Sequence, residues 1–194
     1  MKVLKFGGTS VGSVESIRQI QHIIGQQTED CVVVVSALGG ITDQLLKAAQ
    51  LALQADETYM EVYQQIRQRH LDMANLLIDN ATTRQMLCHE LEGILEELRS
   101  ILFGVHLVKD LSAKSEAVIV SYGEQLSSRI VTAALPGSVR KDSLQFIRTD
   151  RKQGQVLLDT ELTEKLIHQA FSPRPHLAVC PGFISCDSQT DEIT

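Results

Sequence analysis

A glycine-rich stretch near the start of the chain limits its fold more than any other feature. It reads Lys5-Phe6-Gly7-Gly8-Thr9-Ser10-Val11-Gly12 and follows the apolar pair Val3-Leu4. After it, apolar residues recur three and four positions apart, which predicts an amphipathic helix over residues 13–26. Strand, glycine turn and helix in this order are how α/β proteins bring backbone N–H groups and a helix N-terminus to a phosphate.

A continuous apolar run follows at Cys31–Val35. Because it is rich in β-branched residues, it predicts a strand buried on both faces of a parallel sheet. A right-handed crossover would join it to the strand at residues 3–6 and bring the C-terminal ends of both strands to one edge, where ligands of such sheets bind. The glycine stretch and the loop at residues 36–43 are therefore expected to open on the same face.

The glycine stretch has two explanations at this level. Gly7 and Gly8 would let an anion approach the backbone closely, and Lys5 would hold a positive charge beside it. The spacing matches neither a Walker A loop nor the G-x-G-x-x-G dinucleotide fingerprint. A tight turn at the start of a core helix explains the same glycines.

The middle of the chain predicts helices. In the loop at 36–43, Thr42 or Asp43 is expected to cap the helix that follows. Residues 44–103 are expected to be helical, with amphipathic helices near 58–78 and 82–103 and breaks at 56–57, 79–80 and Gly104. We interpret them as a scaffold that packs on the sheet, and we assign no chemistry to their histidines, His70, His89 and His106.

Gly123 lies inside a further helical run that begins near residue 112. A glycine in a helix costs about 1 kcal/mol relative to alanine, so it predicts a break or a close approach of another segment. Glu124 is then either a first-turn acid of the next helix or a carboxylate placed to pair with an ammonium group.

The last part of the chain returns to strands. The polar turn at 136–141 predicts that any strand before Asp142 is missing or very short. A short strand is expected at 156–158, and a helix at 160–171 with Asp159 or Thr160 as its N-cap. A buried strand at 177–180 places the residues after it at the ligand edge of the sheet.

Composition excludes several classes of function. The net charge of −6 and the lack of a Lys/Arg cluster argue against nucleic-acid binding. No signal peptide is recognised, and the apolar runs are far shorter than the roughly 20 residues that span a bilayer, so a cytoplasmic protein without membrane contact is expected. The four cysteines show no C-x-x-C spacing, which favours buried free thiols, and no histidine pattern suggests a metal site.

The sequence resembles the aspartokinases, members of the amino acid kinase family. Four segments carry the resemblance: the unbroken K-F-G-G-T-S-V of residues 5–11, the S-A-x-x-x-x-T-D of 36–43, Gly123-Glu124 followed by Ser127, and the G-F-I of 182–184. The resemblance implies an α/β class with a three-layer αβα arrangement, a mainly parallel sheet of the carbamate kinase-like type, and a helical subdomain at about 43–135.

The resemblance also implies roles for these residues. Lys5 would be catalytic and would hold the phosphates together with Gly7, Gly8, Thr9 and Ser36. The residues implied for aspartate binding are Ser36, Thr42, Glu124, Gly182 and Phe183. ATP would enter with Mg²⁺ carried on its phosphates, and no residue of the chain is assigned as a metal ligand. The implied activity is ATP-dependent phosphorylation of L-aspartate to 4-phospho-L-aspartate, the first step towards lysine, threonine and methionine.

The T-L-G-R-G-G-S-D-like segment that follows in aspartokinases is not found in residues 1–194. We therefore expect an N-terminal part of an aspartokinase catalytic domain, without the nucleotide-binding half and the regulatory domains, inactive alone and part of a homo-oligomer when full length. Two alternatives stay open: an amino acid kinase with a different acceptor, and a non-catalytic scaffold module.

Overall fold

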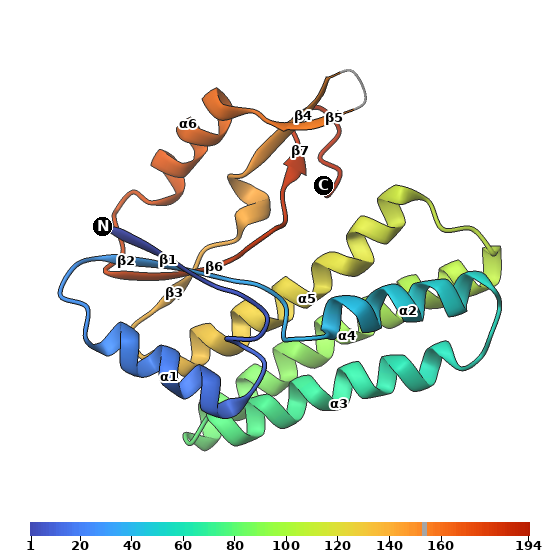
Figure 1. The fold of residues 1–194 in the computed structure, drawn as a ribbon, viewed down its shortest axis with the longest axis horizontal. Helices are drawn as coiled ribbons and strands as arrows, with labels where there is room; N and C mark the ends of the chain where they lie inside the picture. Colours follow the sequence, from blue (N-terminus) through green and yellow to red (C-terminus); the bar gives the residue numbers. More distant parts are fainter. Residues whose placement is uncertain (153–154) are drawn as a thin grey trace.

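Four parallel strands form the central sheet in the computed structural model, which describes residues 1–152 and 155–194 (Figure 1). Their order across the sheet is β1 (Lys2–Phe6), β2 (Cys31–Val35), β6 (Leu177–Pro181) and β3 (Val139–Arg140). The first strand pairs with the second in parallel, with Lys5 opposite Val34, so the predicted βαβ unit is confirmed. The β3 strand has only two residues, as the polar turn before Asp142 predicts.

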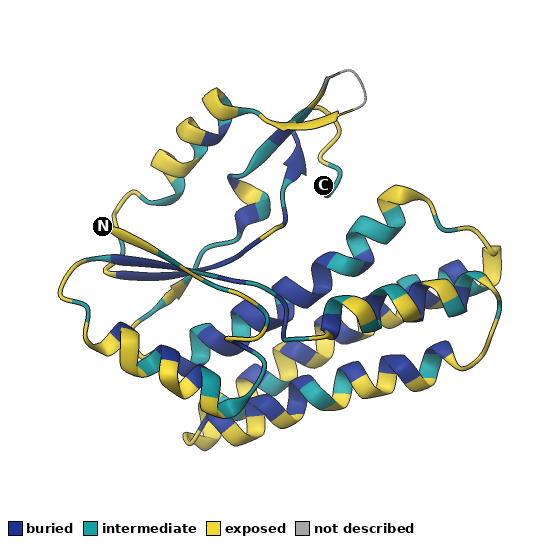
Figure 2. Cartoon of the chain, viewed as in Figure 1, coloured by how far each residue is buried: buried dark blue, intermediate teal, exposed yellow. Residues whose placement is uncertain are grey.

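The two faces of the sheet are covered by different helices. Cys31, Val33 and Val35 belong to the large core that also contains α1 (Val14–Gly25) and α5 (Ala113–Ala134). Val32 faces the other way and packs in a second cluster beside α6 (Thr160–Ala170). Figure 1 shows α6 on one side of the sheet and α1 and α5 on the other, and Figure 2 shows how completely β2 and β6 are buried between them. The expected three-layer arrangement is confirmed.

The remaining helices pack beside the sheet as a bundle with α5. They are α2 (Ile41–Leu53), α3 (Tyr59–Leu77) and α4 (Ala81–Val108), each with a buried apolar stripe and an exposed polar face. A short 3-10 helix, η1 (Ser143–Gln145), precedes a small second sheet made of β4 (Arg148–Lys152), β5 (Gln155–Leu158) and β7 (Cys186–Asp187). None of the helices in the described ranges is long and apolar enough to cross a membrane.

Two expectations about the helices are wrong, and of the two alternatives at Gly123 the helix break is excluded. The α5 helix continues through Gly123, and α4 continues through Gly104 to Val108, because tertiary packing outweighs the small helix penalty of one glycine. The cap of α2 is Gly40, with φ of +80°, so neither Thr42 nor Asp43 has that role and both lie in the first turn. Two other expectations are confirmed: Asp159 caps α6 and all four cysteines are free, although Cys88 is only half-buried.

His70 of α3 is fully buried in the bundle, and this has a consequence for acid stability. Its Nδ1–H donates to the carbonyl of Ile66 at 2.7 Å, while Nε2 has no partner in the described part of the chain. Burial lowers the pKa of the imidazole from 6.5 to about 4, assisted by the positive charge of Arg69. The unfolded chain therefore binds a proton more readily between pH 6.5 and 4.

We expect the free energy of unfolding to fall on acidification by about 2 kcal/mol from this group by pH 5, since each pKa unit corresponds to about 1.4 kcal/mol. His70→Gln should remove this dependence in urea unfolding series at pH 7.5 and pH 5. His89→Gln, at an exposed position of α4, is the control and should retain it. Equal acid sensitivity in His70→Gln and the parent chain would contradict the assignment.

Candidate active site

A hollow of about 550 Å³ opens at the C-terminal ends of β1 and β2. The glycine loop after β1 contributes Gly8, and the loop after β2 contributes Ser36 and Thr42. One wall is a face of α5 that includes Glu124, and Phe183 after β6 closes another side. The two loops that the βαβ argument places on one face of the sheet therefore do meet there.

The two loops touch through glycine backbone. A Cβ built on Gly8 would lie 3.2 Å from the carbonyl oxygen of Ala37 and 3.4 Å from Cα of Gly39. In the other direction, a Cβ on Gly39 would lie 3.1 Å from the carbonyl oxygen of Gly8. Side chains at these positions would push the loops apart, so here the glycines are required by a close approach.

The first loop leaves backbone donors available. Its turn is closed by the N–H groups of Ser10 and Val11, which both donate to the carbonyl of Gly7. The N–H groups of Gly8 and Thr9 find no acceptor among the residues that the structure describes. Ser13 then caps α1 through its side chain. Free amides beside the start of a helix suit an anionic group.

Glu124 is held at the wall of the hollow by the loop after β2. Glu124 as a whole is 7% exposed, and its Oε1 accepts a hydrogen bond from the N–H of Ala37 at 3.1 Å. Burial raises the pKa of this carboxyl above its ordinary value, and the Ala37 hydrogen bond opposes the shift only in part. A buried carboxylate of this kind gains from a cationic partner.

The neighbours of Glu124 on α5 fix its position. Ser127, fully buried, donates from Oγ to the carbonyl of Ser36 at 2.7 Å. At Gly123, a built Cβ would lie 2.7 Å from Cβ of Ala37, closer than any side chain tolerates. The expected close approach at Gly123 is therefore confirmed, and it brings α5 against the loop after β2.

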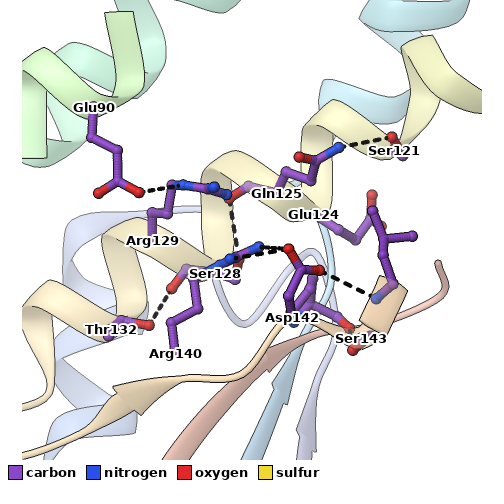
Figure 3. A network of polar contacts seen from close by, with 12 residues as sticks. Glu90, Ser121, Glu124, Gln125, Ser128, Arg129, Thr132, Arg140, Asp142 and Ser143 are labelled. Atoms are coloured by element: carbon purple, nitrogen blue, oxygen red, sulfur yellow. Dashed lines mark hydrogen bonds and ion pairs between the residues drawn. The ribbon is translucent and has the colours of Figure 1, made fainter. Parts of the chain in front are cut away.

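A polar network anchors the other side of α5 to the sheet (Figure 3). Arg140 of β3 donates from Nε to the hydroxyl of Ser128 at 3.1 Å and contacts Asp142 at 3.3 Å. The hydroxyl of Ser143 donates to the carbonyl of Pro181 at the end of β6. The Arg140 contact joins α5 to β3, and the Ser143 contact joins η1 to β6, so the helix that carries Glu124 is tied to the edge of the sheet.

The structure brings only some of the predicted site residues together. Those lining the hollow are Gly8, Ser36, Thr42, Glu124 and Phe183. Gly182 does not line this hollow. It lines a larger apolar hollow of about 810 Å³ on the opposite face of the sheet. Gly7, Thr9 and Lys5 are exposed and do not line the site hollow.

Lys5 shares the sheet face of Val3, because side chains alternate along a strand and Leu4 and Phe6 pack toward the α1 and α5 side. Its ammonium group therefore lies outside the pocket that contains Glu124. Phe183 adopts φ of 60° and leaves its side chain 91% exposed at the rim, a backbone conformation that is uncommon for an aromatic residue.

Sequence reasoning missed part of the α5 wall. Glu116, Val120 and Ser121 line the hollow together with Glu124, at the spacing of one helical face. That periodicity is present in the sequence, but a helix break at Gly123 would have interrupted it. Among the described residues no three His, Cys, Asp or Glu side chains gather where they could hold a metal ion.

Comparison with known proteins defines the class. The amino acid kinase family model matches residues 1–193, and the chain belongs to that family. Among curated relatives, Aspartokinase 2 of Arabidopsis thaliana is 34% identical over 137 residues, covering 69% of this chain and 24% of its own length. The aspartokinase of Chlamydia trachomatis is 30% identical, over 96% of this chain and 40% of its own length.

Solved structures agree on the fold. Escherichia coli aspartokinase III, in complex with aspartate and ADP, superposes on the whole chain with a TM-score of 0.87 at 24% identity. Clostridium acetobutylicum aspartate kinase gives a TM-score of 0.78 at 20% identity. The chain spans 43% and 41% of these two proteins, so it corresponds to less than half of either.

Proposed function

We propose that this chain supplies the acceptor-binding part of an aspartate kinase, which transfers the γ-phosphoryl group of ATP to the side-chain carboxylate of L-aspartate. One observation carries the proposal: the buried carboxylate of Glu124 lies in the hollow beside the two glycine loops. An amino acid offers an ammonium group to pair with it, and the loops offer free amides to a phosphoryl group. The aspartokinase relatives support the choice of aspartate.

The proposed chemistry requires positioning and charge neutralisation. The aspartate carboxylate is already a nucleophile, so no covalent intermediate with the chain is needed. Glu124 would bind the amino group, while Ser36 and Thr42, with Gly182 and Phe183 at the edge, would orient the rest of the substrate. The amides of Gly7, Gly8 and Thr9 would stabilise the transferred phosphoryl group, and Lys5, whose ammonium group lies outside the hollow, would have to turn toward these amides to take part.

Mg²⁺ would reach the site on the phosphates of ATP. It would neutralise phosphate charge there.

We further propose that the nucleotide-binding half and regulatory domains correspond to the parts of the relatives that this chain does not match. The free thiols fit a reducing compartment such as the cytoplasm, and the complete enzyme is proposed to be a homo-oligomer.

The acceptor assignment is tested by titrating the chain with L-aspartate and with N-acetyl-L-aspartate, followed by calorimetry. We expect L-aspartate to bind and the acetylated compound to bind at least about tenfold more weakly, because it cannot form the charged pair with Glu124. Comparable binding of both would favour an amino acid kinase with a different acceptor. Undetectable binding of L-aspartate and of MgATP by the full-length protein would favour a non-catalytic scaffold.

A further inference from the structure

Arg69 of α3 reaches the back of both glycine loops. Its Nη2 donates to the carbonyl oxygen of Gly12 at 3.3 Å, where the first loop passes into the N-cap of α1. A Cβ built on Gly40, the cap of α2, would lie 3.9 Å from Nη1 of the same guanidinium. The guanidinium therefore contacts the end of the first loop and lies near the start of α2, where the second loop ends.

The charge of Arg69 is not used in an ion pair. Among the described residues no carboxylate lies within ion-pair distance of this half-buried guanidinium. Two positions earlier on the same helix, Arg67 points to α4 and pairs with Glu92 at 2.6 Å. An arginine that donates to a backbone carbonyl and has no carboxylate partner places a positive charge near the loop, which favours the binding of an anion there.

We propose that Arg69 is a positioning residue for the phosphate-binding loop. It holds the carbonyl of Gly12 against α3, keeps the Gly8–Gly39 contact closed, and adds an unpaired positive charge behind the free amides of Gly8 and Thr9. The ligand of the loop is the polyphosphate of a nucleotide, and Arg69 does not touch this polyphosphate. This inference rests on the proposed function, since it assumes that the first loop receives phosphates.

The test uses the ¹⁵N-labelled chain and inorganic tripolyphosphate as the probe. Binding is followed by the amide shifts of Gly8 and Thr9. In Arg69→Gln we expect the dissociation constant to rise by about tenfold, because the loop loses both its anchor to α3 and a nearby positive charge. The matched control, Arg67→Gln, removes the same charge from the same helix and should stay within about twofold of the parent.

A second readout separates a charge effect from simple loss of packing. The salt dependence of tripolyphosphate binding should be shallower in Arg69→Gln and should be restored by Arg69→Lys. Equal affinities in Arg69→Gln and the parent chain, or equal losses in the Arg67 and Arg69 variants, would overturn the inference. If Arg69→Gln does not fold, Arg69→Met is compared with Arg67→Met, and identical affinities would overturn the inference as well.

Failure of the proposed function would look different. If tripolyphosphate shifts no amide of the glycine loop in the parent chain, the phosphate role of that loop is wrong, and the role of Arg69 is wrong with it. If the parent chain binds and only the Arg69 variants are unaffected, the loop keeps its role and Arg69 alone is reassigned to structure.

Discussion

Glu124→Gln should weaken L-aspartate binding by about 30- to 100-fold, the usual loss when one member of a buried charged pair is neutralised. Glutamine has the same shape and still accepts the hydrogen bond from Ala37, so the hollow should keep its geometry. What is lost is the negative charge that pairs with the substrate ammonium. Calorimetric titration of both chains with L-aspartate measures the change.

The same substitution should stabilise the unliganded chain at pH 7. Burial raises the pKa of the Glu124 carboxyl, so the folded chain binds this proton more tightly than the unfolded chain does. The contribution of the group to stability is therefore present at low pH and is lost as pH rises through the raised pKa. Glutamine cannot ionise, so urea unfolding at pH 7 should show a higher free energy of unfolding for Glu124→Gln.

Glu116→Gln is the matched control, since Glu116 lines the same hollow from the same helix but is less buried. We expect it to change aspartate affinity less than Glu124→Gln does. A larger loss in the Glu116 variant would move the ammonium-binding role to that residue. An unchanged affinity in both variants would remove the charged-pair argument for the substrate.

Gly123→Ala should lower the free energy of unfolding by about 2 kcal/mol, although alanine is the better helix former by about 1 kcal/mol. The added methyl group would lie 2.7 Å from Cβ of Ala37 and 3.4 Å from Cδ1 of Leu45. The α5 helix must then move away from the loop after β2, and Glu124 moves with it. Loss of aspartate affinity should therefore accompany loss of stability.

Gly104→Ala should have the opposite effect on stability. Gly104 also lies inside a long helix, but nothing is within 4 Å of a Cβ built there. We expect the free energy of unfolding to rise by about 1 kcal/mol, because alanine has the higher helix propensity and reduces the conformational entropy of the unfolded chain. Thermal and urea unfolding of the two variants test the pair, and destabilisation by both substitutions would show that helix context, not the Ala37 contact, governs Gly123.

The amino-acid sequence predicts the sheet of this protein well, for local reasons. The apolar run at Cys31–Val35 predicts a strand buried on both faces, and the glycine stretch before α1 predicts a turn. The right-handed crossover between the two strands then places both loops at one edge of the sheet. Ser36, Thr42 and Glu124 could be named from short motifs, and all three line the hollow.

Contacts between distant residues decide the rest of the site. The Ala37–Glu124 hydrogen bond joins residues 87 positions apart, and the Arg69–Gly12 hydrogen bond joins residues 57 apart. Neither is visible in a local pattern, and Gly123 appears as a helix break until α5 is seen packed on Ala37. Local periodicity and chirality thus determine which segments are strands and helices and which loops share an edge. Only tertiary packing decides that α5 is continuous, that Lys5 lies outside the hollow, and that Arg69 lies behind the glycine loops.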